Sequence, residues 1–325
     1  MKRITKLLPI VCIVLISSCK AIEDPADVIG TTENNLYVNN WMMDILQEAY
    51  YWNEHLNFNA DNKQKPDAFF DDVMYWYNPV TAPTGDRFSW IQEDYTVLQD
   101  YLNGVASKEI GFDYSLFWAD DAHVNVIGQI NYVKKGTAAA LLGLKRGMIF
   151  NKIDGVQLTA SNVGSLLDFT GNLYALNMVE PSYNENDSLV GYADVRVANV
   201  QTMNSYAENP VYLDSVYTIG SKKIGYFVYH FFSADPGTGN DLYDLQMNAV
   251  FARFKAAGIT DLVLDLRYNS GGSVNTATNL ASNIVPDLSS NKLLIYYEYN
   301  RLLMDYYRNK YGPEEFKTYF TTTLL

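Results

Sequence analysis

The chain has 325 residues, of which 48% are hydrophobic and 14% aromatic, so it can bury a substantial core and is not intrinsically disordered. Its formal net charge of −13 argues against a nucleic-acid partner, because phosphate contacts require a basic face. A chain of this length indicates two or three domains.

The first residues have the pattern of a secretory leader. Three basic residues among the first six precede an apolar run over residues 7–16, which is too short to span a bilayer. Two serines and Cys19 follow, a pattern that resembles the bacterial lipobox, in which the cysteine carries lipid. We therefore expect residues 1–18 to be a signal peptide and residues 19–35 a tether that begins at the lipidated Cys19. The alternative is an ordinary secretory peptide cut nearby.

The cysteines and histidines argue against thiol and metal chemistry. Cys12 lies in the leader and Cys19 at the lipidation position, so the mature chain has no thiol for a disulfide, a zinc cluster or a nucleophile. The three histidines, His55, His123 and His230, are scattered over three regions, which disfavours a catalytic triad or a metal site. We expect no metal and no cofactor. The leader predicts a cell-envelope protein that is lipid-anchored to the outer membrane, on its periplasmic or surface face.

Residues 36–105 indicate a small helical domain. Apolar residues recur at helical spacing over residues 41–52, with Asn39 or Asn40 as a candidate N-cap. Further helices are expected over residues 66–76 and 94–101.

The pattern changes to short β-runs in a domain that we place at residues 108–203. Runs over residues 112–118 and 124–132 predict strands. A short alanine-rich helix follows and is closed by Gly143, and the next strand ends in the hairpin turn Asp154-Gly155.

Residues 211–325 alternate between strands and helices, which implies an α/β layer. The helix expected over residues 241–257 ends at Gly258, a residue typical of helix C-termini. The other elements are expected over residues 224–231 (strand), 261–266 (strand), 274–285 (helix), 293–299 (strand) and 302–311 (helix).

A double-glycine turn joins the strand over residues 261–266 to the next helix. Free backbone N–H groups and the helix dipole both favour a negatively charged oxygen at Gly271 and Gly272. The glycine-rich phosphate-binding motifs are absent, which leaves a plain strand-to-helix turn as the alternative.

Three features in this order resemble the S41 family of serine peptidases, the C-terminal or tail-specific processing peptidases. They are Asp-Arg-Phe-Ser-Trp-Ile at residues 86–91, a permuted PDZ pattern at residues 136–155, and Asp-Leu-Arg-Tyr-Asn-Ser-Gly-Gly at residues 265–272. The PDZ pattern departs from the family at Ala138, which replaces a proline, and at Met148, which replaces an aspartate. The resemblance implies a multidomain α/β protein with a helical N-terminal domain, a PDZ-like β-rich domain and a partial ClpP/crotonase-like peptidase domain.

The resemblance also implies roles for two loops. A backbone N–H of Gly271 or Gly272 would form part of an oxyanion hole, while Asp265 and Arg267 hold the turn through hydrogen bonds and Asn269 suits it. Ile110, Gly111 and Phe112 resemble the PDZ loop that binds a peptide C-terminus, and an ordinary β-turn is the alternative.

The nucleophilic serine and basic lysine of the family have no match here. The serines and lysines after the double-glycine turn do not lie in the expected strand-to-helix setting, and the chain ends at Leu325, about where the nucleophile strand should begin. They are Ser273, Ser282, Ser289, Ser290, Lys292, Lys310 and Lys317.

Two functions follow from the resemblance. The first is an S41-type serine endopeptidase that cleaves peptides or proteins in the cell envelope and is truncated or inactive as given. The alternative is a non-catalytic PDZ-type peptide-binding lipoprotein. A third function, a surface glycan-binding lipoprotein, is supported only by the leader and the aromatic content. The expected partners are peptide or protein C-termini and the membrane, through the lipid anchor.

Overall fold

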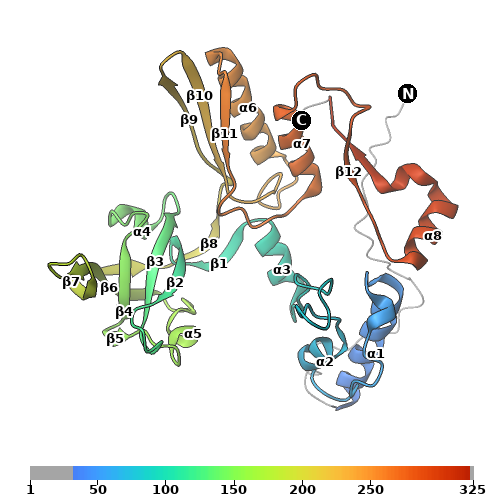
Figure 1. Ribbon diagram of the computed structural model, residues 1–325, viewed down its shortest axis with the longest axis horizontal. Coiled ribbons are helices and arrows are strands. Elements are labelled where there is room, and N and C mark those ends of the chain that lie inside the picture. The colour runs from blue at the N-terminus through green and yellow to red at the C-terminus, as the bar shows by residue number, and fades with distance from the viewer. Residues whose placement is uncertain (1–31, 323–325) are drawn as a thin grey trace. The chain divides into compact units, whose positions relative to one another are not determined.

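The computed structural model describes residues 32–322, so the predicted leader, Cys19 and most of the tether lie outside the described residues. The chain divides into two compact units, one of residues up to Ile91 together with Tyr297–Phe316, the other of Gln92–Tyr296 and the residues from Lys317 onward. Helices and several sheets alternate along the chain (Figure 1), which confirms the mixed α/β fold class. No helix between residues 32 and 322 is both long and apolar enough to cross a membrane.

The first unit is helical. Its helix α2 begins at Pro66, where the missing N–H of proline costs nothing, and buries Phe69, Phe70 and Val73. These side chains pack against Met42 and other residues of the preceding helix. The elements of this unit are α1 (Thr32–Ala49), η2 (Asn53–His55), α2 (Pro66–Val73), α8 (Arg301–Tyr311) and η3 (Pro313–Phe316).

The expected N-cap at Asn39 or Asn40 is wrong, because α1 begins at Thr32. Asn39 instead lies fully buried inside α1, where its Nδ2 donates to the carbonyls of Asn62 (3.0 Å) and Gln64 (2.8 Å). The loop that supplies these acceptors is distant in sequence, so local spacing could not distinguish a capping asparagine from a loop-binding one.

Helix α8, which the sequence predicts within the C-terminal α/β region, lies in the first compact unit. Asn300 caps α8 by accepting from Leu303 N (2.9 Å), and its Nδ2 donates to the carbonyls of Glu48 (2.8 Å) and Tyr50 (2.9 Å) at the end of α1. One buried side chain thus hydrogen-bonds backbone carbonyls at the end of α1 and a backbone N–H at the beginning of α8. The elements after residue 211 are therefore divided between the two compact units.

The second unit begins with α3 (Tyr95–Leu102), which Asp94 caps by accepting from Thr96 N (2.8 Å). The N-terminal part of the first compact unit ends at Ile91, so α3, which the sequence predicts in the helical domain, lies in the second unit. After α3, strand β1 (Val105–Glu109) pairs antiparallel with β8 (Met203–Ala207), so the ends of the intervening β-rich segment lie side by side.

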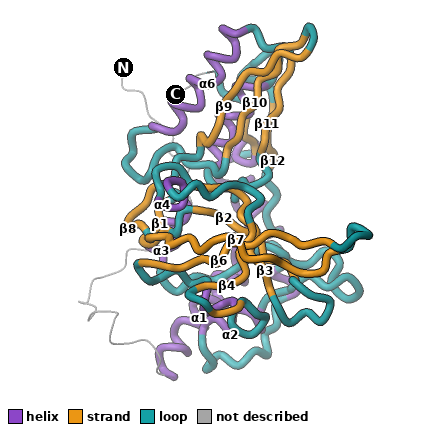
Figure 2. Tube along the Cα trace, turned by 90° about the vertical axis from the view of Figure 1, so that its left-hand side faces the viewer, coloured by secondary structure: helices purple, strands orange, loops and turns teal. Residues whose placement is uncertain are grey.

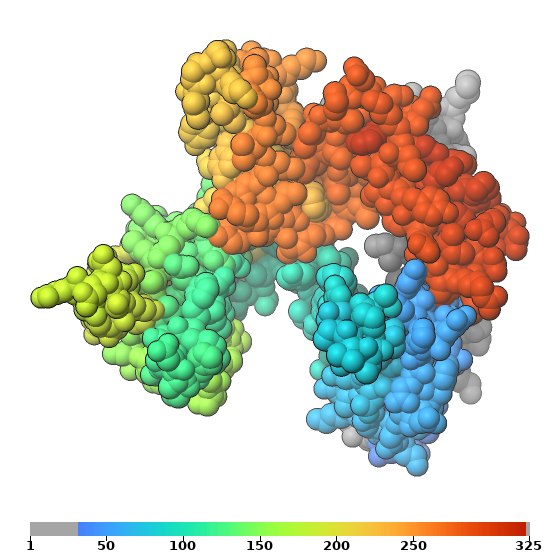
Figure 3. Space-filling view, in the orientation of Figure 1, coloured from blue at the N-terminus to red at the C-terminus, as the bar shows by residue number. Residues whose placement is uncertain are grey.

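The β-rich segment forms an antiparallel six-stranded sheet of order β2-β3-β4-β6-β7, with β5 paired to β4 and β2 at one edge. Asp154 and Gly155 both have positive φ between β4 and β5, the geometry of the predicted two-residue hairpin. The β6–β7 hairpin projects from its sheet (Figure 3). The elements are β2 (Phe112–Trp118), β3 (Val126–Val133), α4 (Ala138–Leu141), β4 (Ile149–Ile153), β5 (Val156–Gln157), α5 (Val163–Leu166), β6 (Leu173–Tyr183) and β7 (Leu189–Gln201).

The α/β layer consists of a three-stranded sheet of order β11-β10-β9 with two helices (Figure 2). Strand β10 runs parallel to β11 and antiparallel to β9. Phe227 and Tyr229 of β10 pack against Met247 and Phe254 of α6 and Leu280 of α7. The elements are β9 (Val211–Ile219), β10 (Lys222–Tyr229), α6 (Leu242–Ala257), β11 (Asp261–Asp265) and α7 (Val274–Ile284), followed by the antiparallel pair β12 (Leu293–Tyr296) and β13 (Lys317–Tyr319).

Candidate functional site

Asp265 fixes the backbone where β11 ends. Its carboxylate, on a side chain that is 6% exposed, accepts hydrogen bonds from Arg267 Nε (2.9 Å) and from Tyr226 Oη (2.6 Å). The hydrogen bond from Arg267 holds the pKa of Asp265 far below its usual range, against the opposing effect of burial. The ionised carboxylate therefore connects Arg267, just beyond the strand, to Tyr226 on the neighbouring strand β10.

Asn269 and Ser270 attach the turn to the end of β10. Asn269 Nδ2 donates to the Tyr229 carbonyl (3.1 Å), while its Oδ1 accepts from the N–H of Gly271 (2.9 Å). The N–H of Ser270 donates to the carbonyl of His230 (3.0 Å). Asn269 therefore holds the turn against the end of β10. The Gly271 N–H is already engaged in a hydrogen bond with Asn269.

Gly272 is the glycine whose N–H remains available. The Phe232 N–H donates to the Gly271 carbonyl (2.7 Å) and the Ser273 N–H to the Phe232 carbonyl (2.7 Å), so this bridge does not use the N–H of Gly272. Among the described residues that N–H has no hydrogen-bond acceptor, and Gly272 is exposed at the beginning of α7. A Cβ on Gly272 would lie 2.2 Å from the Phe232 oxygen, so only glycine fits.

An apolar hollow of about 380 Å³ lies against the same bridge residue. Phe232 contributes to its lining together with the end of β11 and one side of α7. A hollow of this size accommodates an apolar side chain of a bound peptide. The lining residues are Phe232, Leu264, Leu266, Ala277, Leu280, Ala281, Ile284, Val285 and Phe320.

The candidate serines near the turn are engaged in local hydrogen bonds. Ser273 Oγ accepts from the Thr276 N–H at the beginning of α7, and the buried Ser282 donates to the Thr278 carbonyl (2.7 Å). Lys292 Nζ donates to the Pro286 carbonyl (3.0 Å). Ser273, Ser282 and Lys292 thus bond backbone groups rather than one another, and they do not form the serine–lysine dyad that the resemblance implies.

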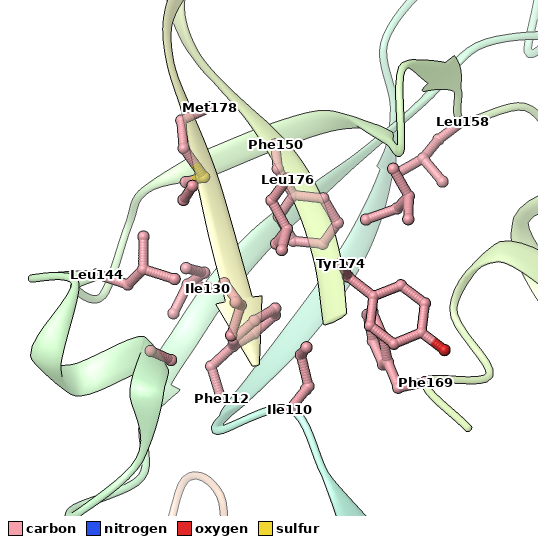
Figure 4. Close-up of a cluster of buried hydrophobic side chains, with 14 of the residues drawn as sticks. Ile110, Phe112, Ile130, Leu144, Phe150, Leu158, Phe169, Tyr174, Leu176 and Met178 are labelled. Atoms are coloured by element: carbon pink, nitrogen blue, oxygen red, sulfur yellow. The ribbon is translucent and has the colours of Figure 1, made fainter. Parts of the chain in front are cut away.

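The second candidate loop lies between β1 and the edge strand β2. Ile110 and Phe112 are 5% and 3% exposed and point into the hydrophobic core of the six-stranded sheet (Figure 4). Gly111 has φ +96° and donates its N–H to Glu109 Oε1 (2.7 Å). The N–H that the resemblance assigns to a peptide carboxylate is therefore engaged by an internal carboxylate in this structure.

Glu109 belongs to a buried polar cluster that the sequence did not predict. Lys134 Nζ forms ion pairs with Glu109 (2.7 Å) and Glu208 (3.1 Å), and Glu208 Oε1 lies 3.0 Å from Nδ1 of His230. Tyr132 Oη also donates to Glu208 (3.1 Å). The cluster therefore connects the Gly111 loop to His230, whose carbonyl holds the candidate oxyanion turn.

Electrostatics favour the charged forms of Lys134 and Glu208. Burial opposes the charge on Lys134, but Glu208 and Glu109 outweigh it and raise the pKa of the ammonium. Burial likewise opposes the charge on Glu208, but the hydrogen bond from His230 and the charge of Lys134 lower its pKa. No local signal could have found the cluster, since its members come from β1, β3 and the segments flanking β9 and β10.

No metal centre is seen in the described part of the chain, where no three His, Cys, Asp or Glu side chains group as ligands. The histidines have unrelated surroundings: His55 stacks on Tyr75 and His123 on Trp118, while His230 contacts Glu208.

Comparisons with known proteins match two segments of the chain to family models. The family model for the peptidase S41 N-terminal domain matches residues 37–90, and the model for peptidase family S41 matches residues 223–317, which include the double-glycine turn. No curated protein matches.

Among solved structures, the fold is similar to that of a protein from Bacteroides fragilis assigned to the S41 proteases, with a TM-score of 0.62 and 23% identity. The match covers 86% of this chain and 65% of that one, so the chain spans less than two thirds of that relative. A photosystem II D1 C-terminal processing protease matches with a TM-score of 0.40 and 15% identity, over 82% of this chain and 70% of that one. The chain thus resembles S41 family peptidases in two sequence segments and in fold, which confirms the resemblance that the sequence predicted.

Proposed function

We propose that the chain supplies the peptide-binding and oxyanion-stabilising part of an S41-type serine endopeptidase of the C-terminal processing kind, and that Gly272 is an oxyanion donor. The observation that carries this proposal is the unengaged, exposed N–H of Gly272 at the beginning of α7. In acyl transfer the substrate carbonyl oxygen becomes negatively charged, and one prealigned N–H donor stabilises that charge by about 3 kcal/mol. The α7 dipole adds to this effect.

The same proposal assigns substrate binding to two further features. The apolar hollow beside Phe232 would receive an apolar side chain next to the scissile bond. The unpaired edge of β2 would accept an extended peptide as an additional strand, as in PDZ domains, which makes residues 108–203 the peptide-binding domain. Cys19 would hold the protein at the outer membrane through its lipid.

A second candidate is a peptide-binding lipoprotein without catalysis. It is favoured by one observation: Ser273, Ser282 and Lys292 bond backbone groups rather than one another. Under this proposal the β2 edge and the Gly272 turn bind a peptide, and no bond is cleaved.

A fluorophosphonate probe and a peptide assay separate the two functions. The purified full chain is incubated with the probe and, separately, with unstructured peptides that end in apolar residues, and both reactions are followed by mass spectrometry. A peptidase labels one serine stoichiometrically and cleaves the peptides, and Gly272→Ala lowers both rates because its Cβ meets the Phe232 oxygen and displaces the N–H from its position. Peptide binding with neither labelling nor cleavage supports the second candidate, whereas failure to bind, label and cleave would refute both.

The lipid anchor is tested separately. The chain expressed with an alkyne-labelled fatty acid should become labelled and sediment with membranes, and Cys19→Ala should abolish both. A soluble, unlabelled wild-type chain would contradict the proposed anchoring.

A further inference from the structure

The polar cluster contains more carboxylates than lysines. Glu109 and Glu208 face one ammonium, that of Lys134, and their side chains are only 8% and 10% exposed. Burying an acidic side chain is costly unless strong partners compensate. The Glu109 carboxylate has such partners in two groups, the Lys134 ammonium (2.7 Å) and the N–H of Gly111 (2.7 Å).

These two partners would bind any carboxylate. An N–H of a glycine in a tight loop and a nearby ammonium together form a charge-assisted binding position for a carboxylate. Glu109 occupies that position with its own side chain, from a residue only two positions before Gly111. Any other carboxylate can reach the position only if the Glu109 side chain leaves.

The binding position does not depend on Glu109 for its shape. The Gly111 carbonyl accepts from the backbone N–H of Lys134 (2.9 Å), and a Cβ on Gly111 would lie 2.6 Å from Thr137 Oγ1. Thr137 is itself held by its hydrogen bond to the Lys134 carbonyl (2.7 Å). The loop backbone is therefore fixed by β3 and by the beginning of α4, so its N–H keeps its direction when the Glu109 side chain is absent.

We propose that Glu109 is an internal ligand that occupies a carboxylate-binding position formed by Gly111 and Lys134, and that an external carboxylate must displace it to bind. The identity of that carboxylate as a peptide C-terminus rests on the peptide-binding function proposed above. Because Lys134 also contacts Glu208, and Glu208 contacts His230, displacement of Glu109 alters the cluster that adjoins the double-glycine turn.

The test uses acetate, the simplest carboxylate, and the full chain labelled with 15N-glycine. Glu109→Ala removes the internal carboxylate, and bound acetate would restore the original balance of charges. The Gly111 amide resonance should move on acetate titration of Glu109→Ala, with an apparent affinity about tenfold or more above that of the wild type. The exposed Glu180→Ala is the matched control and should titrate like the wild type.

Two further variants keep the test decisive. Glu109→Gln has nearly the same shape and tests whether a neutral side chain yields to acetate more readily than glutamate does. Glu109→Ala combined with Lys134→Met should lose the acetate affinity that the single variant gained. A folded Glu109→Ala variant whose Gly111 resonance titrates no more tightly than the wild type would overturn the proposal, as would unchanged affinity in the double variant.

A peptide arm separates this inference from the proposed function. Peptides with a free C-terminus and their C-terminally amidated forms are titrated into the wild type and Glu109→Ala. Tighter binding of the free carboxylate form to Glu109→Ala supports both the internal ligand and the peptide-binding function. Acetate binding without discrimination between the peptide forms supports the internal ligand and refutes recognition of peptide C-termini.

Discussion

Asp244 should make the α/β layer less stable as the pH rises towards neutrality. This carboxyl on α6 is 1% exposed, its Oδ1 has no hydrogen-bond partner, and Oδ2 is 3.4 Å from Thr276 Oγ1. Burial raises its pKa to about 6 from 3.8, despite the neighbouring Asn279 and Thr276 side chains, which favour the ionised form. The folded chain therefore holds this proton more tightly than the unfolded chain does.

The sign and magnitude follow from this difference in proton affinity. Because the folded pKa is the higher one, the stabilisation is fully present below pH 3.8 and is lost as the pH rises through about 6. The total loss is about 3 kcal/mol, since one pH unit corresponds to about 1.36 kcal/mol. Between pH 4.5 and 7.5 the loss is about 2 kcal/mol. Asp244→Asn, which carries no charge at either pH, should be more stable than the wild type at pH 7.5 by about 1–3 kcal/mol.

Urea unfolding followed by circular dichroism at pH 4.5 and 7.5 measures this effect. The stability gap between Asp244→Asn and the wild type should widen by about 2 kcal/mol as the pH rises. Asp287→Asn makes the same chemical change at an exposed position and serves as the control. A gap that stays constant with pH, or that narrows, would refute the assignment of Asp244 as a buried carboxyl with a raised pKa.

Three further predictions concern the turn and the helical unit. Gly272→Ala should destabilise the α/β layer by about 2 kcal/mol or more and shift the NMR resonances of the turn, because its Cβ would lie 2.2 Å from a backbone carbonyl oxygen. Gly271→Ala has no atom within 4 Å of its Cβ and should cost only about 1 kcal/mol, from backbone strain. Equal losses in urea titrations would contradict this. Asn300→Ala should lower the stability of the helical unit, measured by thermal unfolding, by about 2–3 kcal/mol, because the helix cap and two further hydrogen bonds are lost. A loss below about 0.5 kcal/mol would contradict this prediction. Arg267→Gln should lower the free energy of unfolding at pH 7 and make it fall less steeply as the pH is lowered, because the low pKa of Asp265 contributes stability that disappears in acid. An unchanged loss of stability between pH 7 and acidic pH would exclude this role.

The elements that the sequence predicted well depend on short-range interactions. The Asp154-Gly155 hairpin and the end of α6 at Gly258 follow from backbone conformations that only a few residue types adopt readily, and both have positive φ in the structure. Strand β2 begins and ends at the predicted residues, because its apolar run is bounded by turn residues.

The errors arise where a side chain has a partner far away in the sequence. Asn300 lies about 250 positions from the carbonyls of Glu48 and Tyr50, so nothing in its neighbourhood indicates that α8 joins the N-terminal helices. For the same reason Asn39 was taken for a helix cap, although its acceptors lie in a later loop. Spacing along the chain measures local periodicity and carries no information about such pairs.

Local sequence patterns were enough to predict the α/β class, the S41 resemblance and the double-glycine turn, because a strand, two glycines and a helix N-terminus are encoded within a dozen neighbouring residues. The choice between the two glycines required the packed structure, since Asn269 Oδ1 accepts from the Gly271 N–H while the bridge to Phe232 leaves the Gly272 N–H free. It also decided that the Gly111 N–H is occupied, because Glu109, Lys134 and Glu208 become neighbours only when separate strands pack together and must satisfy one another's buried charges.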